Sequence, residues 1–136
     1  MSNRPRNGEV FRYSYLWRRE SERGEDAGRK IRPVCLSVLL DKDAGKTRVA
    51  LFPITSQPPS KERASLQIPE TELKRLGLRE PAWVILDECN LDIWEASFHV
   101  SDRRPLGRVS YALFERIRVV ALEQLRAGFL GQIPRR

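Results

Sequence analysis

The sequence predicts an α+β fold that is mostly β: a small, strongly bent antiparallel sheet, barrel-like in shape, followed by a C-terminal amphipathic helix. Several short apolar runs rich in β-branched and aromatic residues are separated by turn residues. A longer stretch near the end, Tyr111 to about Arg126, repeats apolar residues at helical spacing. The 136 residues suit one domain, which we expect to span residues 8–130.

The first half of the chain is expected to supply three strands after a loose tail at residues 1–7. Glu9 to Leu16 predicts an aromatic-rich strand. Arg32 to Leu40 is almost continuously apolar, and residues 41–46 have the composition of a hairpin turn leading into Thr47 to Ile54. We therefore expect these last two strands to pair antiparallel.

Residues 17–31 separate the first two strands. They carry dense charges of both signs and contain glycines, without a periodic apolar face. We predict a long exposed loop here, and long loops in small domains are commonly functional.

The second half is expected to alternate short elements with loops. Ser65 to Ile68 predicts a short strand, and Pro69 to Leu76 a short helix with Gly77 at its C-terminal cap. Ala82 to Glu88 predicts another strand, whereas residues 90–107 are expected to be mostly irregular.

The terminal helix has clear boundary signals. Ser110 is a suitable N-cap for a helix from Tyr111 to about Arg126, and Gly128 is placed to end it. Residues 131–136 are then expected to form a basic tail.

The charge balance favours a nucleic-acid partner. Lysine and arginine outnumber the acidic residues and leave a formal net charge of +7. Most of these basic residues are arginine, which binds phosphate bidentately. A GC-rich coding sequence would explain the same arginine excess without any such partner.

Other features exclude several classes of function. No segment reaches the ~18 consecutive apolar residues of a membrane helix, and Met1 to Gly8 does not resemble a signal peptide, so we expect a cytoplasmic protein without membrane contact. Cys35 and Cys89 lie in apolar strand-like runs and are expected to be free, buried thiols. A single histidine and two isolated cysteines provide no metal-ligand spacing, so we expect no metal.

Two polar residues at strand ends, Arg32 and Thr55, are candidates for catalysis. Cleavage of RNA by internal transfer needs a group that engages the 2′-hydroxyl and groups that stabilise negative charge on the phosphorus oxygens. A guanidinium donates bidentately to phosphate, and a threonine hydroxyl can donate to a non-bridging oxygen. The ordinary alternatives are a solvated edge arginine and a turn threonine.

Other chemistry-bearing residues are weaker candidates. His99 is a lone histidine in an expected loop, and we interpret it as a bystander. Asp87 and Glu88 are adjacent on an expected strand and should point to opposite faces, which makes a poor carboxylate pair. Three aromatic residues are able to stack on bases, although packing in the core is the more common role: Tyr13, Trp17 and Trp94.

Five short motifs follow one another in a characteristic order. They are Gly8-Glu9-Val10, Gly28 to Pro33 with Arg32 before the proline, Pro53-Ile54-Thr55-Ser56, Val84-Ile85-Leu86-Asp87, and Gly107 to Ser110 before the terminal helix. Each motif is unspecific alone. Their order and spacing, over residues 8–127, resemble the MazF/PemK family of toxin ribonucleases from bacterial toxin–antitoxin modules.

This resemblance implies an SH3-like barrel that forms a homodimer and cleaves single-stranded RNA at short sequence motifs, without a metal or cofactor, by attack of the 2′-hydroxyl. By position, it implies that Arg32 and Thr55 are the catalytic residues. It further implies a small acidic antitoxin as partner, and a loop at residues 17–31 that helps to cover RNA. The residues expected to bind RNA are Ser56, Arg29, Lys30 and Trp17.

One stretch departs from the family pattern. Asp87 to Asp92 is acidic where related toxins carry a Gln-Ile-Arg-like segment, and the loop that continues to Arg104 is longer than usual. Acidic groups near the site would oppose phosphate binding by about one to a few kcal/mol. An inactive descendant of the toxin fold is therefore one alternative.

A second alternative is a non-enzymatic growth inhibitor of the CcdB type, which acts by binding DNA gyrase through its terminal helix. Apolar residues at the end of the chain favour this function, although they also suit a dimer interface or a cover for the barrel. These residues are Phe129, Leu130 and Ile133.

Overall fold

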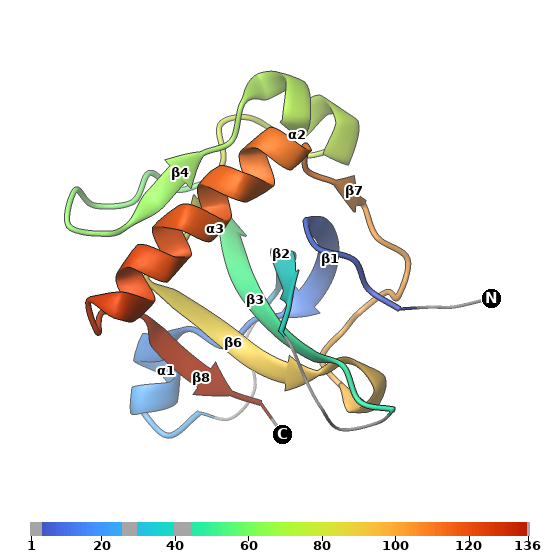
Figure 1. The fold of residues 1–136 in the computed structure, drawn as a ribbon, viewed down its shortest axis with the longest axis vertical. Coiled ribbons are helices and arrows are strands. Elements are labelled where there is room, and N and C mark those ends of the chain that lie inside the picture. The colour runs from blue at the N-terminus through green and yellow to red at the C-terminus, as the bar shows by residue number, and fades with distance from the viewer. Residues whose placement is uncertain (1–3, 26–29, 40–44, 136) are drawn as a thin grey trace.

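A curled, mostly antiparallel sheet forms a half-barrel, and one long helix packs across it (Figure 1). The structure is a computed structural model that describes residues 4–25, 30–39 and 45–135. The strands are β1 (Glu9–Ser14), β2 (Ile31–Val38), β3 (Arg48–Thr55), β4 (Ser65–Gln67), β5 (Trp83–Ile85), β6 (Glu88–Ile93), β7 (Gly107–Arg108) and β8 (Gly131–Pro134). The helices are α1 (Arg18–Glu22), α2 (Glu70–Leu76), α3 (Tyr111–Arg126) and a single 3-10 turn, η1 (Trp94–Ala96). The predicted α+β, mostly β fold with a C-terminal helix is confirmed.

Strands β1, β2 and β3 form an antiparallel meander at the centre of the sheet. The β2–β3 pairing sets Val34 opposite Pro53 and Val38 opposite Val49, which confirms the predicted hairpin. Most of the expected turn, residues 41–44, lies outside the described residues. β1 pairs with β2 on one side and with β7 on the other, so both edges of β1 are covered.

The strand expected over Ala82 to Glu88 is split in two. β5 pairs with the C-terminal end of β3, whereas β6 pairs with its N-terminal half. Between β5 and β6, the Leu86 amide donates to Ala64 O at 2.9 Å instead of joining the ladder with β3. The single-strand prediction was wrong because residues 86–87 separate β5 from β6, and the part of β6 that pairs with β3 begins only at Asn90.

Two other expectations are corrected. Residues 90–107 were expected to be mostly irregular, but their first part is regular, because β6 continues to Ile93 and η1 follows. Residues 131–134 are not a tail, because β8 pairs parallel with β6 and its Ile133 is buried. The expected N-terminal tail is also tied down in its described part, since Val38 N donates to Asn7 Oδ1 at 2.6 Å.

The two faces of the sheet bury separate apolar clusters, because successive strand residues point to opposite sides. One cluster, which includes Val10, Phe52 and Ile54, is covered by the Leu113, Phe114 and Ile117 face of α3. The other cluster consists of Phe11, Tyr13, Tyr15, Trp17, Val34, Leu36, Val49, Leu51, Ile85 and Trp94. Cores on both faces explain why the short central strands are so apolar.

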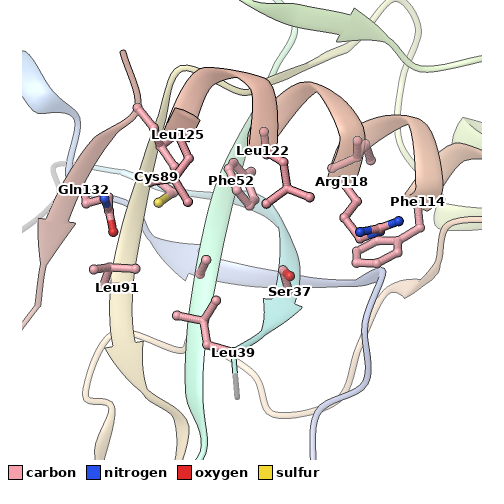
Figure 2. A pocket seen from close by; sticks show the side chains of 14 residues that line it. Ser37, Leu39, Phe52, Cys89, Leu91, Phe114, Arg118, Leu122, Leu125 and Gln132 are labelled. Carbon is pink, nitrogen blue, oxygen red and sulfur yellow. The ribbon is translucent and has the colours of Figure 1, made fainter. Parts of the chain in front are cut away.

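Helix α3 does not close tightly on the sheet at its C-terminal half. Figure 2 shows the apolar space there, about 130 Å³, with Phe52, Leu91 and Leu122 pointing into it. Cys89 lines the same space, and burial raises the pKa of both Cys35 and Cys89 to about 12. Both cysteines are free and buried, as expected from the sequence. No helix of the described residues is long and apolar enough to cross a membrane.

Glu72 of α2 connects that helix to the start of α3. Its Oε1 accepts a hydrogen bond from the Ser110 amide at 2.9 Å, and its Oε2 accepts one from the Ser110 hydroxyl. Ser110 in turn caps α3 by accepting from Leu113 N. Burial alone would raise the pKa of Glu72, but the hydrogen bonds from Ser110 and the nearby Arg75 hold it below its ordinary value.

Glu72→Gln is expected to lower the free energy of unfolding near pH 7 by about 1–2 kcal/mol. A carboxylate with a lowered folded-state pKa stabilises the fold above its unfolded pKa, and this contribution disappears as the pH falls through the folded value. The difference between wild type and variant should therefore shrink as the pH falls below the ordinary pKa of a glutamate. Urea denaturation near pH 7 and below this pKa measures it, and a difference independent of pH would contradict the assignment.

Candidate functional site

A groove of about 440 Å³ opens where β2 begins and β3 ends. The two strands pair antiparallel as far as Val34 opposite Pro53, and Arg32 and Thr55 each lie two residues beyond this last pair on their own strand. Both side chains line the groove. The structure thus brings together the two residues that the sequence singled out for catalysis.

Further polar residues join Arg32 and Thr55 in the lining. They are Lys30, Ser56, Gln57 and Arg79. Three of the lining residues are cationic, and none of the described lining residues is acidic. Of the residues expected to bind RNA, Lys30 and Ser56 lie in the groove, whereas Arg29 lies outside the described residues.

Arg32 is half-buried and oriented by an aromatic ring. Its guanidinium carbon lies 5.0 Å from the ring centroid of Trp17. Its Nε is buried and has no hydrogen-bond partner among the described residues. Burial lowers the pKa of Arg32, an effect that the carboxylate of Glu20 opposes and the charge of Arg19 increases. The arginine stays charged because its ordinary pKa is so high.

Thr55 is placed as a donor. Its Oγ1 accepts a hydrogen bond from the Gln57 amide at 3.1 Å. Because a hydroxyl has one proton and two lone pairs, this contact leaves the proton of Thr55 able to donate to a ligand oxygen. Ser56, directly after it, is exposed.

Trp17 is not the open stacking platform that the sequence suggested. Only 6% of its surface is exposed, and its ring lies 5.1 Å from that of Tyr15 in an edge-on contact. The expected loop at residues 17–31 was also partly wrong, because α1 begins directly after Trp17. Glu20 fixes this start, since its Oε1 accepts from Trp17 N at 3.0 Å.

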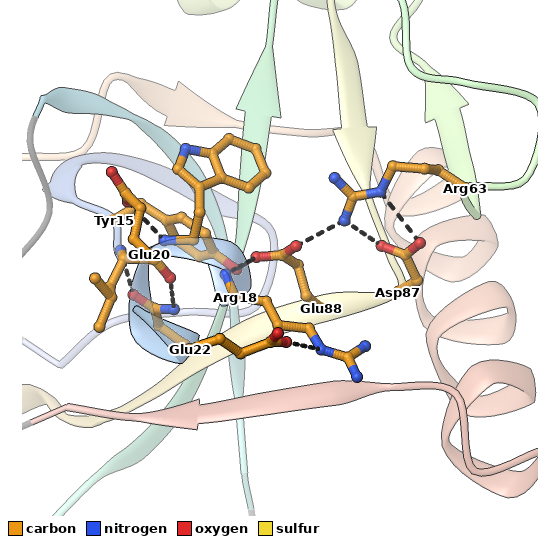
Figure 3. Close-up of polar contacts among 10 residues, drawn as sticks. Tyr15, Arg18, Glu20, Glu22, Arg63, Asp87 and Glu88 are labelled. Carbon is orange, nitrogen blue, oxygen red and sulfur yellow. Dashed lines mark hydrogen bonds and ion pairs between the residues drawn. The ribbon is translucent and has the colours of Figure 1, made fainter. Parts of the chain in front are cut away.

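Asp87 and Glu88 do not point apart. Both carboxylates bind the Arg63 guanidinium, whose Nη2 lies 2.6 Å from Asp87 Oδ1 and 2.7 Å from Glu88 Oε2 (Figure 3). The expected alternation fails because β6 begins only at Glu88. Neither carboxylate lines the groove, and Arg63, which binds both, offsets one of their two negative charges.

His99 is also absent from the described lining of the groove. Its Nδ1 lies 3.0 Å from Nη2 of Arg135, a buried residue just after β8. Arg135 also donates to Ser14 O at 2.6 Å and to Asn90 Oδ1 at 2.9 Å. Through Arg135, His99 is therefore connected to hydrogen bonds that hold the fold together, away from the groove. In the described part of the chain, no group of three or more potential metal ligands occurs.

Sequence reasoning missed Arg79 and Arg63. Arg79 reaches the groove because α2 ends at Leu76 and Gly77 turns the chain with a φ of +70°. Only the capping glycine signalled this turn, and no local pattern indicated what Arg79 would face. Arg63 lies between two strands in a segment with no periodicity.

Comparisons with known proteins add no assignment: neither models of known protein families nor curated protein sequences gave a match. The resemblance to MazF/PemK toxins therefore stays a prediction based on the order of the motifs.

Proposed function

We propose that this protein is a toxin-type ribonuclease that cleaves single-stranded RNA at short sequence motifs, with Arg32 and Thr55 as its catalytic residues. The observation that carries the proposal is the groove in which these residues meet two further cations and no described carboxylate. A polyanionic strand suits such a groove, because guanidinium and hydroxyl donors form charge-assisted hydrogen bonds with phosphate oxygens.

In the proposed reaction, the ribose 2′-hydroxyl loses its proton to water, and its oxygen attacks the adjacent phosphorus and displaces the 5′-oxygen, which takes up a proton from water. The products are a 2′,3′-cyclic phosphate and a free 5′-hydroxyl. Arg32 binds the non-bridging oxygens on which negative charge increases, and the Thr55 hydroxyl donates to one of them. Lys30 and Arg79 attract and hold the flanking phosphates.

The test is incubation of the purified protein with a long single-stranded RNA, in EDTA and in Mg²⁺ in parallel, followed by mapping of the ends. We expect discrete cuts with 5′-hydroxyl ends under both conditions. Cuts that require Mg²⁺ would contradict the metal-independent reaction. Intact RNA under both conditions would contradict the ribonuclease and favour the binding-protein alternative.

The proposal extends to the partners implied by the resemblance: a second copy of the chain and a small acidic antitoxin, both in the cytoplasm. The formal charge of +7 supports an acidic partner. Co-purification with the product of a neighbouring reading frame that encodes an acidic, poorly ordered tail would test this part.

Thr55→Ala is expected to lower kcat by about 10- to 100-fold, because one hydrogen bond to a charged oxygen is removed. Thr55→Ser keeps the hydroxyl and should retain most of the activity. Single-turnover cleavage of a short oligonucleotide measures both variants. Equal cleavage rates for the alanine and serine variants would show that the Thr55 hydroxyl takes no part in the reaction.

A further inference from the structure

The indole of Trp17 is surrounded by guanidinium groups. The Cζ atoms of Arg19 and Arg32 each lie 5.0 Å from its ring centroid, and Cζ of Arg63 lies 5.9 Å away. Of these three arginines, only Arg32 lines the groove. Its buried Nε, which has no hydrogen-bond partner among the described residues, indicates that the aromatic contact takes the place of a hydrogen bond.

We infer that Trp17 positions Arg32 for the phosphate, and that Trp17 itself does not contact RNA. This inference rests on the proposed function. A long arginine side chain loses conformational freedom when it binds, and a cation–π contact fixes the guanidinium before the ligand arrives. With Nε buried, the two Nη atoms remain as the fork that binds phosphate oxygens.

Trp17 is held in turn by β6, on both of its flanks. Before it, Leu16 N donates to Asn90 Oδ1 at 2.9 Å, and Asn90 Nδ2 donates to Leu16 O at 2.7 Å. After it, Arg18 N donates to Glu88 Oε1 at 2.9 Å. The backbone on either side of Trp17 is therefore fixed to one strand of the sheet.

Glu88 is itself held in place by neighbouring groups. The Tyr15 hydroxyl donates to its Oε1 at 3.0 Å, and Arg63 binds its Oε2. Glu88 is 4% exposed, so these contacts are shielded from water. The acidic stretch that departs from the toxin family therefore has a role in this chain: through Glu88, it fixes the segment that carries Trp17.

The test compares Trp17→Leu, which removes the aromatic ring, with Trp17→Phe, which keeps one. Trp94→Leu is the matched control, because Trp94 is also buried at 4% exposure, belongs to the same apolar cluster and lies 4.7 Å from the Cζ of Arg103, outside the groove. We expect Trp17→Leu to lower kcat about ten-fold with KM nearly unchanged. Trp17→Phe and Trp94→Leu should keep most of kcat.

Two kinetic outcomes would overturn the inference. If Trp17 stacks on a base, Trp17→Leu should raise KM more than it lowers kcat. If it serves only the stability of the fold, Trp94→Leu should lower kcat as much as Trp17→Leu does.

A measurement that needs no cleavage separates this inference from the proposed function. In wild type, the Arg32 Nε–H proton should show a ring-current shift in its NMR resonance that disappears in Trp17→Leu and not in Trp94→Leu. If wild type cuts no RNA, the proposed function fails, and binding of a 2′-O-methyl oligonucleotide replaces kcat as the readout. Weaker binding by Trp17→Leu than by Trp17→Phe would support the inference that Trp17 positions Arg32. An Arg32 Nε–H resonance without a ring-current shift in wild type would overturn this inference, even if Trp17→Leu did not fold.

Discussion

Replacing Arg32 with alanine is expected to lower RNA cleavage by about a thousand-fold, because a preorganised donor to the developing negative charge is lost. The fold should persist, since Arg32 is half-buried at the rim of the groove and its Nε has no hydrogen-bond partner among the described residues. The measurement is kcat/KM on a defined oligonucleotide, together with the thermal midpoint.

Two further variants sharpen this result. Arg32→Lys keeps the charge but loses the planar fork, so it should recover only part of the activity. Arg116→Ala removes an exposed arginine from α3, outside the groove, and should cleave like wild type. A wild-type rate for Arg32→Ala would exclude Arg32 from the reaction.

Arg63→Ala is expected to lower the free energy of unfolding by about 3 kcal/mol. The change leaves Glu88, whose side chain is 5% exposed, as a buried carboxylate without its cation, although Tyr15 and the Arg18 amide still donate to it. Urea denaturation near neutral pH measures the loss.

A surface ion pair provides the control for this prediction. Arg118 lies 2.9 Å from Glu115 on α3, and their side chains are 50% and 34% exposed. Exposed pairs contribute about 0–1 kcal/mol, so Arg118→Ala should have a much smaller effect than Arg63→Ala. Similar losses for both variants would show that Glu88 does not depend on Arg63.

Elements with local signals could be predicted from the sequence. The β2–β3 hairpin followed from two apolar runs around turn residues, α2 from Gly77 at its end, and α3 from Ser110 at its start. These signals act over a few residues. The split between β5 and β6 and the parallel strand β8 could not be predicted in this way, because they depend on partners far away in the chain.

The candidate site shows the same division. Arg32 and Thr55 could be identified because they lie near the start and at the end of two strands that follow one another in the sequence. The burial of Trp17 was hidden by the charged residues that follow it, since α1 exposes those charges and turns Trp17 and Glu20 inward. The contacts of Arg63 and Arg79 form between separate segments, so no periodicity indicated them.

The hydrogen bonds between the Trp17 segment and β6 have a consequence for the order of assembly. The Leu16–Asn90 contact spans 74 residues of sequence, whereas the β2–β3 hairpin closes locally. During synthesis on the ribosome, Arg32 and Thr55 can come together long before Asn90 has been made. A partly synthesised chain would therefore hold both groups without the support that orients the arginine. Until β6 has joined the sheet, any RNA cleavage by the nascent chain would therefore be slower, by about the ten-fold loss expected for Trp17→Leu.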